Sequence, residues 1–199
     1  MVNFVPKVVP GYQEEAKKRI LQAALEVFAE RGYYGSTMDD VAEKLNISKG
    51  AIYQYFSSKH QLLGELYASG PENLKSMFLS SAGLSPVDAS KEVFNRMVTK
   101  SFARLWVVFL AEASKNPDLQ ETMRDNIDGF NDVLEQLLKT STPNMGRKEL
   151  DQAHRLAVIL GLLFNGLVSW VAVGIPETEV RKVWEDSREI LFSVFGFKT

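Results

Sequence analysis

Apolar residues recur at helical spacing along almost the whole chain. In residues 13–31, one helical face carries Ile20, Ala24, Val27 and Phe28, and Gly32 follows as a stop signal. The same spacing predicts a helix over residues 58–81, one long or two shorter helices over 87–115, and further helices over 118–139, 156–175 and 180–194. No strand-like run lies between the turn signals, so the predicted fold class is all-α.

Residues 37–59, TMDDVAEKLNISKGAIYQYFSSK, have the spacing of two short helices joined by a turn. Thr37 followed by Asp40 is a capping pair that begins the first helix. Residues 46–48 form the turn, and we expect the second helix to extend over 48–56 with its apolar side chains facing the first. A helix-turn-helix of this kind places its second helix in the major groove. The pattern therefore predicts DNA binding.

The exposed residue types of the second helix suit contact with DNA. A glutamine can bond an adenine edge, a lysine can reach guanine or a phosphate, an alanine methyl can lie against thymine, and a glycine lets the backbone come close. Tyrosine hydroxyls and the Lys59 ammonium suit phosphate oxygens. The groove-facing candidates are Lys49, Gly50, Ala51, Tyr53, Gln54 and Tyr55. The alternative is that the tyrosines join an aromatic core stripe, which is the interpretation we adopt for Phe56.

Residues 20–63 resemble the N-terminal domain of TetR-family transcriptional regulators. The shared features are the Gly32-Tyr33 helix exit, Thr37, the Val41-Ala42 pair, the Ser48-Lys49-Gly50 entry, the Tyr53-x-Tyr55-Phe56 run and Lys59. This match covers about a quarter of the chain, and the remainder agrees with the family in length and helical character.

The resemblance implies a role for each matched residue. Lys49, Ala51 and Gln54 would face bases, whereas Thr37, Tyr53, Tyr55 and Lys59 would contact the phosphate backbone. It also implies a homodimer on double-stranded DNA, an effector pocket in the larger C-terminal domain, and repression relieved by a small molecule. The expected organisation is a flexible arm over 1–12, a helix-turn-helix domain over 13–58, and a helical ligand-binding and dimerisation domain over 59–199.

Composition narrows this picture. The 199 residues include no cysteine, which excludes disulfides and sulfur-based metal sites and fits a cytoplasmic protein. The net charge is −2, and residues 1–60 hold eight Lys/Arg against seven Asp/Glu. DNA affinity must therefore come from a local arrangement of bases, for which the candidates are Lys17, Lys18, Arg19, Lys49 and Lys59. Residues 1–12 have neither a signal nor a transit pattern, and Lys7 is their single base for a minor-groove contact.

Residues 156–175, LAVILGLLFNGLVSWVAVGI, are nearly long enough to span a bilayer. Asn165 at the centre, Ser169 and three glycines argue against a membrane span. A helix that is apolar all round also suits a bundle interior that packs on the domain core and on a partner subunit. The last helix has apolar residues at a, d and e spacing, so the two helices predict a four-helix dimer interface; the alternative is that they close a monomeric core.

The sequence offers little for catalysis, a cofactor or a metal site. His60 and His154 stand apart from any nucleophile or carboxylate cluster, and no HExxH or glycine-rich phosphate loop occurs. Bulky residues of the C-terminal domain favour an apolar chamber instead, although they suit a plain core equally well. The candidates for effector contact are Phe94, Met97, Phe102, Trp106, Phe109, Phe130, Asn131 and Asn165.

Two hypotheses follow. The first is a repressor released from a palindromic operator by a small apolar or amphipathic effector, such as a fatty acyl compound, an aromatic molecule or a steroid-like lipid. The alternative is a DNA-binding dimer whose C-terminal domain docks a protein partner. An all-helical enzyme or membrane protein leaves residues 37–59 unexplained.

Overall fold

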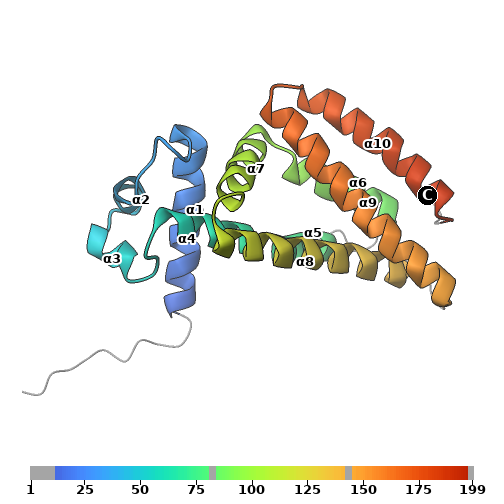
Figure 1. Ribbon diagram of the computed structural model, residues 1–199, viewed down its shortest axis with the longest axis horizontal. Coiled ribbons are helices and arrows are strands. Elements are labelled where there is room, and N and C mark those ends of the chain that lie inside the picture. The colour runs from blue at the N-terminus through green and yellow to red at the C-terminus, as the bar shows by residue number, and fades with distance from the viewer. Residues whose placement is uncertain (1–11, 81–83, 142–144, 197–199) are drawn as a thin grey trace, which may run out of the picture. The chain divides into compact units, whose positions relative to one another are not determined.

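The computed structural model describes residues 12–80, 84–141 and 145–196, and all regular structure in these ranges is helical (Figure 1). The predicted all-α class is confirmed. The helices are α1 (Tyr12–Arg31), α2 (Met38–Leu45), α3 (Lys49–Tyr53), α4 (Lys59–Ala68), α5 (Gly70–Ser80), α6 (Pro86–Met97), α7 (Lys100–Ala113), α8 (Pro117–Ser141), α9 (Arg147–Ala172) and α10 (Glu177–Val194). Of the predicted arm over 1–12, only Tyr12 lies within the described residues.

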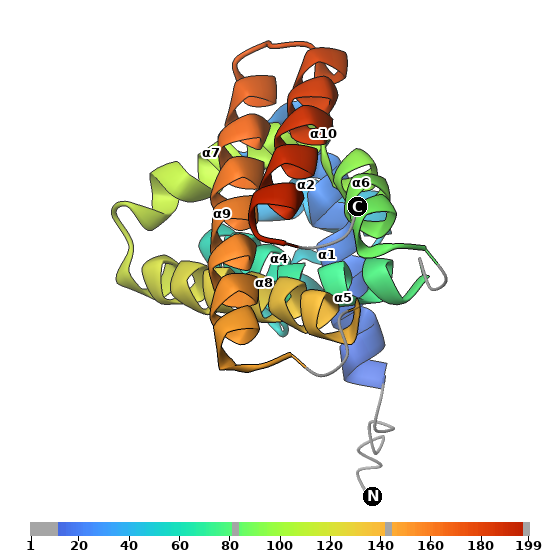
Figure 2. The same cartoon turned by 90° about the vertical axis from the view of Figure 1, so that its right-hand side faces the viewer.

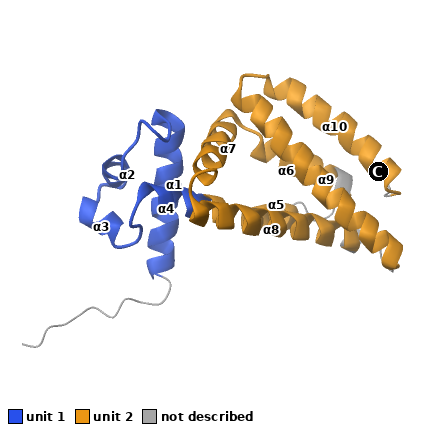
Figure 3. Cartoon of the chain, in the orientation of Figure 1, with its two compact units in different colours: residues 1–66 blue, residues 67–199 orange. Residues whose placement is uncertain are grey.

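The chain divides into two compact units, residues 1–66 and 67–199 (Figure 3). The division falls inside α4, eight residues beyond the predicted boundary at 58/59. The first unit packs α1 against α2 and α2 against α3. Its core lies between these helices and the start of α4, and consists of Ile20, Ala24, Val27, Phe28, Val41, Ile52, Phe56, Leu62 and Leu63.

The second unit is built around α9, which packs against α7, α8 and α10. Figure 2 shows α10 running beside α9, and α8 crossing it. The predicted caps are confirmed: the Ser85 hydroxyl accepts from the Asp88 amide at 3.1 Å, and Asn116 Oδ1 accepts from the Asp118 amide at 2.9 Å. The segment over 87–115 forms two helices, since Val98 and Thr99 separate α6 from α7.

The single helix expected over residues 58–81 is wrong, because the chain breaks between α4 and α5 at Ser69. Pro71 explains the break: it has no N–H to donate to the carbonyl of Tyr67, and its ring crowds that carbonyl. The freed Tyr67 carbonyl accepts a hydrogen bond from the side-chain amide of Asn126 on α8 instead. The break is therefore tied to α8 by a side chain that is only 3% exposed.

Two glycines let α8 and the α4–α5 junction approach closely. A Cβ added at Gly129 on α8 would lie 2.8 and 2.9 Å from ring carbons of Pro71. A Cβ at Gly70 would lie 3.0 Å from the Phe130 ring. Neither contact leaves room for a methyl group, so the junction requires small residues on both sides.

Most of the apolar helix predicted over 156–175 lies in α9, which begins earlier, at Arg147, and ends at Ala172. Among the described helices, α9 is long and apolar enough to cross a membrane. Its buried residues line one side, including Ala153, Leu156 and Leu160, and belong to the core of the second unit. Leu162, Trp170 and Val173 are exposed on another side. A core helix with one uncovered apolar face meets the same length and composition criteria as a membrane span.

The Gly129→Ala variant should lose about 1–3 kcal/mol of stability, because its methyl group overpacks the Pro71 ring. The measurement is denaturant unfolding of the full chain. Gly161→Ala is the matched control on α9, since its nearest neighbour is the end of the Asn131 side chain at 3.3 Å, which can rotate away. Equal stability of the two variants would contradict the close packing of α8 on Pro71.

Candidate nucleic-acid interface

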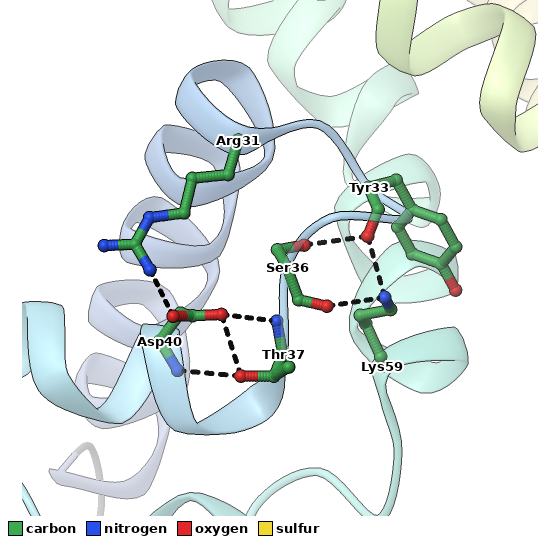
Figure 4. A network of polar contacts seen from close by, with 6 residues as sticks. All are labelled: Arg31, Tyr33, Ser36, Thr37, Asp40 and Lys59. Atoms are coloured by element: carbon green, nitrogen blue, oxygen red, sulfur yellow. Dashed lines mark hydrogen bonds and ion pairs between the residues drawn. The ribbon is translucent and has the colours of Figure 1, made fainter.

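The helix-turn-helix begins at the predicted capping pair (Figure 4). The Thr37 hydroxyl accepts from the Asp40 amide at 3.2 Å, and the Asp40 carboxylate accepts from the Thr37 amide at 2.7 Å. Hydrogen bonds from the Thr37 side chain and amide hold the pKa of Asp40 below its ordinary value. Asp40 also pairs with Arg31 at the end of α1. The first turn of α2 is thereby fixed to α1.

The loop between α1 and α2 is held by Lys59 at the start of α4. The Lys59 ammonium donates to the carbonyls of Tyr33 and Ser36, each at 2.7 Å, and lies 4.4 Å from the centre of the Tyr33 ring. Gly35 lets this loop fold tightly, since a Cβ there would lie 2.6 Å from the Arg31 carbonyl oxygen. These contacts give Lys59 a positioning role that the sequence did not indicate. A phosphate contact at this ammonium remains a prediction.

The turn between α2 and α3 depends on Asn46, whose φ of 54° and ψ of 43° are left-handed. The Asn46 amide donates to the Glu43 carbonyl at 3.0 Å and the Ile47 amide to the Ala42 carbonyl at 3.1 Å. This pair of bonds is the Schellman ending of a helix, in which asparagine replaces the commoner glycine. Two residues later the Ser48 hydroxyl accepts from the Ala51 amide at 3.3 Å and begins α3.

The second helix is shorter than expected, because α3 ends at Tyr53 rather than Phe56. The amides of Tyr55 and Phe56 both donate to the Ile52 carbonyl, at 2.9 and 3.0 Å, and close a turn in place of another helical turn. Ile52 and Phe56 are buried as predicted. Gln54 and Tyr55 therefore lie on the turn that follows α3.

The base- and phosphate-facing candidates lie at the surface of the first unit. Tyr53 is 45% exposed, which contradicts its placement in an aromatic core stripe, while Tyr55 is partly buried. A Cβ at Gly50 would meet nothing within 4 Å, so packing within the subunit does not require a glycine there. The exposed candidates are Thr37, Lys49, Gly50, Tyr53 and Gln54, and Ala51 is partly exposed.

Lys49 has an intramolecular partner that was not predicted from the sequence. Its ammonium lies 2.8 Å from the carboxylate of Asp39 on α2, and both side chains are more than half exposed. The hydrogen bond to Asp39 raises the pKa of Lys49. The signal in the sequence is a carboxylate in the first turn of α2 and a lysine at the start of α3, ten residues later.

The effector-contact candidates are divided among the aromatic contacts of the second unit. Phe94 stacks on Trp184, with ring centres 4.4 Å apart, and contacts Phe164 edge-on. Trp106 and Phe109 stack on Tyr67, with ring centres 5.3 and 3.7 Å away. Three of the candidates, Phe94, Trp106 and Phe109, are at most 4% exposed, and Met97, Phe102, Phe130, Asn131 and Asn165 are partly buried.

Polar atoms are buried among these rings. Trp106 Nε1 donates to the Ser169 hydroxyl at 3.3 Å. Within the described ranges, Asn126 Oδ1 and Trp184 Nε1 are buried without a hydrogen-bond partner. Buried polar atoms are nearly always paired in proteins, so these two need an explanation. Within residues 12–80, 84–141 and 145–196, no group of three His, Asp or Glu side chains could hold a metal ion.

Comparison with known proteins decides the family. Residues 20–66 match the model of bacterial regulatory proteins of the TetR family, and residues 89–193 match the C-terminal model of BetI-type transcriptional repressors. The second match alone covers more than half of the chain. The chain belongs to the TetR family of transcriptional regulators. Members of this family bind DNA and are not enzymes, which confirms both of those predictions.

Relatives extend over most of the chain. The transcriptional regulator SrpR of Pseudomonas putida is 28% identical over 166 residues, covering 78% of this chain and 77% of its own. The fatty acid metabolism regulator protein of Bacillus subtilis is 24% identical over 163 residues, covering 77% and 82%. A solved structure of a transcriptional regulator from Saccharomonospora viridis in complex with choline shares the fold, with a TM-score of 0.67 at 21% identity, covering 88% and 96%.

Replacement of Lys59 distinguishes its two roles in this TetR-family protein. Lys59→Met removes the donor to the Tyr33 and Ser36 carbonyls, so we expect a loss of about 1–3 kcal/mol in unfolding free energy. Denaturant unfolding measures it. Unchanged stability, with a salt dependence of DNA binding reduced by about one ion per subunit, would show a phosphate contact instead.

The Gly50→Ala variant should separate stability from DNA binding. Alanine fits the free protein and favours the helix, so we expect a gain of about 0.5–1 kcal/mol in stability. We expect weaker DNA binding because the methyl group keeps the α3 backbone away from the groove. Denaturant unfolding and fluorescence-anisotropy titration of labelled DNA give the two values. A variant that binds DNA as tightly as the parent would contradict close approach at Gly50.

Proposed function

We propose that this TetR-family protein is a homodimeric repressor that leaves a palindromic operator when a small apolar or amphipathic effector binds its second unit. The observation that carries the proposal is the pair of exposed apolar stripes on α9 and α10. They give a DNA-binding chain a surface for a second copy, and two copies are what a palindromic site requires.

In the complex with DNA, some residues of the α3 region would contact bases and others would contact phosphates. Lys49, Ala51 and Gln54 would face base edges, with Gly50 letting the backbone approach. Phosphate contacts would come from the Tyr53 and Tyr55 hydroxyls and the Lys59 ammonium, which donate without reading sequence. Thr37 would join them only by giving up the hydrogen bond that its hydroxyl donates to the Asp40 carboxylate at 2.8 Å. The exposure of Lys49, Tyr53 and Gln54 supports this assignment.

The proposed dimer surface follows the helical period on both helices. On α9 the exposed stripe is Leu162, Gly166 and Trp170, continued by Val173 directly after the helix; on α10 it is Val183, Ile190 and Val194. Gly166 adds a specific argument, since a Cβ there would meet nothing within 4 Å in the subunit. A glycine on an exposed apolar stripe lets the backbone of a partner helix come close, as small residues do in tight helix pairs. Two helices from each subunit would form a four-helix interface.

The interior of the second unit supports an effector of mixed polarity. Aromatic side chains supply apolar faces, and the unpartnered Asn126 Oδ1 and Trp184 Nε1 would accept from and donate to polar groups of a ligand. The relationship to a fatty acid metabolism regulator supports an acyl compound. The choline bound to the Saccharomonospora protein supports a small amphipathic cation as a second class.

Effector binding would act on DNA affinity through α4, which begins in the first unit and ends in the second. A ligand that prefers one position of α4 shifts the separation of the two DNA-reading heads. A difference of about 1–3 kcal/mol in effector affinity between the two positions is enough for a useful response. This regulation would take place in the cytoplasm, where the operator DNA lies.

The second candidate function is docking of a protein partner by the C-terminal unit. An exposed apolar helix face can be covered by a different chain as well as by a second copy. In this candidate the chain is still a DNA-binding dimer, and a protein partner takes the place of the small effector. A dimer that carries a small molecule or releases DNA in response to one supports the effector, and an empty dimer supports the partner.

Native mass spectrometry of the purified protein tests the dimer directly. We expect dimer mass for the parent and monomer mass for Leu162→Glu combined with Val194→Glu, because two carboxylates would be buried in the interface. Leu79→Glu is the matched control: Leu79 on α5 is 68% exposed, as is Leu162, but lies outside the stripe. A double variant that stays dimeric would refute this interface.

The same spectra test the effector, since a co-purified ligand appears as added mass on the dimer. Operator DNA is first isolated by selection from a random duplex library. Palmitate, decanoate and choline are then titrated into the protein–DNA complex, with displacement expected for at least one acyl probe. An empty dimer that holds its DNA against every probe would favour the partner-docking function.

A further inference from the structure

We propose that Asp39 and Lys49 act together as a reader of one G·C base pair in each half-site, with Asp39 as a specificity-determining residue. This inference rests on the sequence-specific DNA binding proposed above. Neither composition nor the predicted roles of the α3 residues assigned any function to Asp39.

The two side chains form an isolated, exposed pair at the reading surface. Asp39 is the second residue of α2 and Lys49 the first of α3, so the ion pair links the first turns of the two helices of the helix-turn-helix. The ammonium and the carboxylate are 2.8 Å apart and are 60% and 57% exposed. Among the described residues neither side chain has another hydrogen bond or ion pair. Both therefore keep further capacity for an external partner.

The ion pair has no net charge, which does not suit a contact with a phosphate group. A lysine that neutralises phosphate works as a single positive charge, and a carboxylate at 2.8 Å cancels that charge. The carboxylate would also face the negative backbone of the duplex. A pair with no net charge is better suited to base edges, which present neutral donors and acceptors.

The order of donor and acceptor favours a G·C pair. In the major groove guanine presents the acceptors N7 and O6, and cytosine presents the N4 amino donor beside them. The Lys49 ammonium would donate to guanine O6 or N7, while the Asp39 carboxylate accepts from cytosine N4. In an A·T pair the single donor, adenine N6, lies between the acceptors N7 and O4, so a carboxylate there meets repulsion on both sides.

The ordinary interpretation of Asp39 is an acid in the first turn of a helix, which stabilises α2 through the helix dipole. That role affects folding but carries no base preference. Asp40 already completes the capping box, so the cap does not need Asp39. Base preference is therefore the measurement that separates the two roles.

The test is selection from a randomised duplex library, followed by sequencing, with the full-length parent and three variants. The parent should enrich sites with a G·C pair at one position of each half-site. Asp39→Asn should reduce the preference at that position by roughly tenfold and leave the others unchanged. It should also steepen the salt dependence of binding by about one ion per subunit, since Lys49 is released to contact phosphate.

Glu30→Gln is the matched control, because it removes an equally exposed carboxylate from the pair with Lys44 and should leave the selected sequence unchanged. The exchanged variant, Asp39→Lys with Lys49→Asp, keeps the ion pair but reverses the order of donor and acceptor, so it should select C·G at the same position. If the parent selects a defined site and Asp39→Asn selects the same site with unchanged preference at every position, the proposal for Asp39 and Lys49 is wrong but sequence-specific binding stands. Failure of the parent to enrich any sequence overturns both.

Discussion

Where a helix breaks, backbone carbonyls lose their helical hydrogen-bond partners. The arrangement of the helices depends on how these carbonyls are paired again. Backbone carbonyls buried away from water must be paired, and the described ranges, which have no strands, offer helices and side chains to pair them. Three polar side chains do this. Lys59 bonds the Tyr33 and Ser36 carbonyls, Asn126 bonds that of Tyr67, and Arg181 bonds those of Asn95 and Val98 at 2.8 and 2.9 Å. Each joins a break to a helix distant in sequence, so these three connections are held in place by the packing of the helices.

These bonds connect the fold to the function of each unit. In the first unit, Lys59 holds the loop that leads into the Thr37 cap and therefore sets where α2 and α3 begin. In the second, Asn126 donates its amide nitrogen to the carbonyl at the α4–α5 break, and its oxygen is buried without a hydrogen-bond partner within the described ranges. A ligand that engages this oxygen would act directly on the residue that anchors the end of α4. Asn126 could therefore both stabilise the α4–α5 break and transmit ligand binding to α4.

Much of this could be predicted from the sequence because the signals were local. Thr37 with Asp40, Ser85-Pro86 and Asn116-Pro117 each fix a helix start within four residues, and all were correct. The break in the helix expected over 58–81 also had a local signal in Pro71, which the helical spacing of the apolar residues concealed. The other misses came from contacts between distant residues, such as the hydrogen bond from Asn126 on α8 to the freed Tyr67 carbonyl. Tyr53 was ambiguous because alternating aromatic residues do not reveal which side packs inward, and the partners of Lys49 and Lys59 lie ten and more than twenty residues away.

The near-neutral charge of the reading head has a structural origin and a consequence for control. Every basic side chain from residue 31 to residue 59 has a partner within the subunit: Arg31 pairs with Asp40, Lys44 with Glu26 and Glu30, Lys49 with Asp39, and Lys59 with two carbonyls. Three of these four charges lie beside carboxylates, so this segment offers phosphates little uncompensated positive charge. In the proposed dimer, affinity would then depend on base contacts and on the simultaneous docking of two heads. A small change in head separation would weaken both at once, so an effector with a modest preference between two states would be enough to clear the operator.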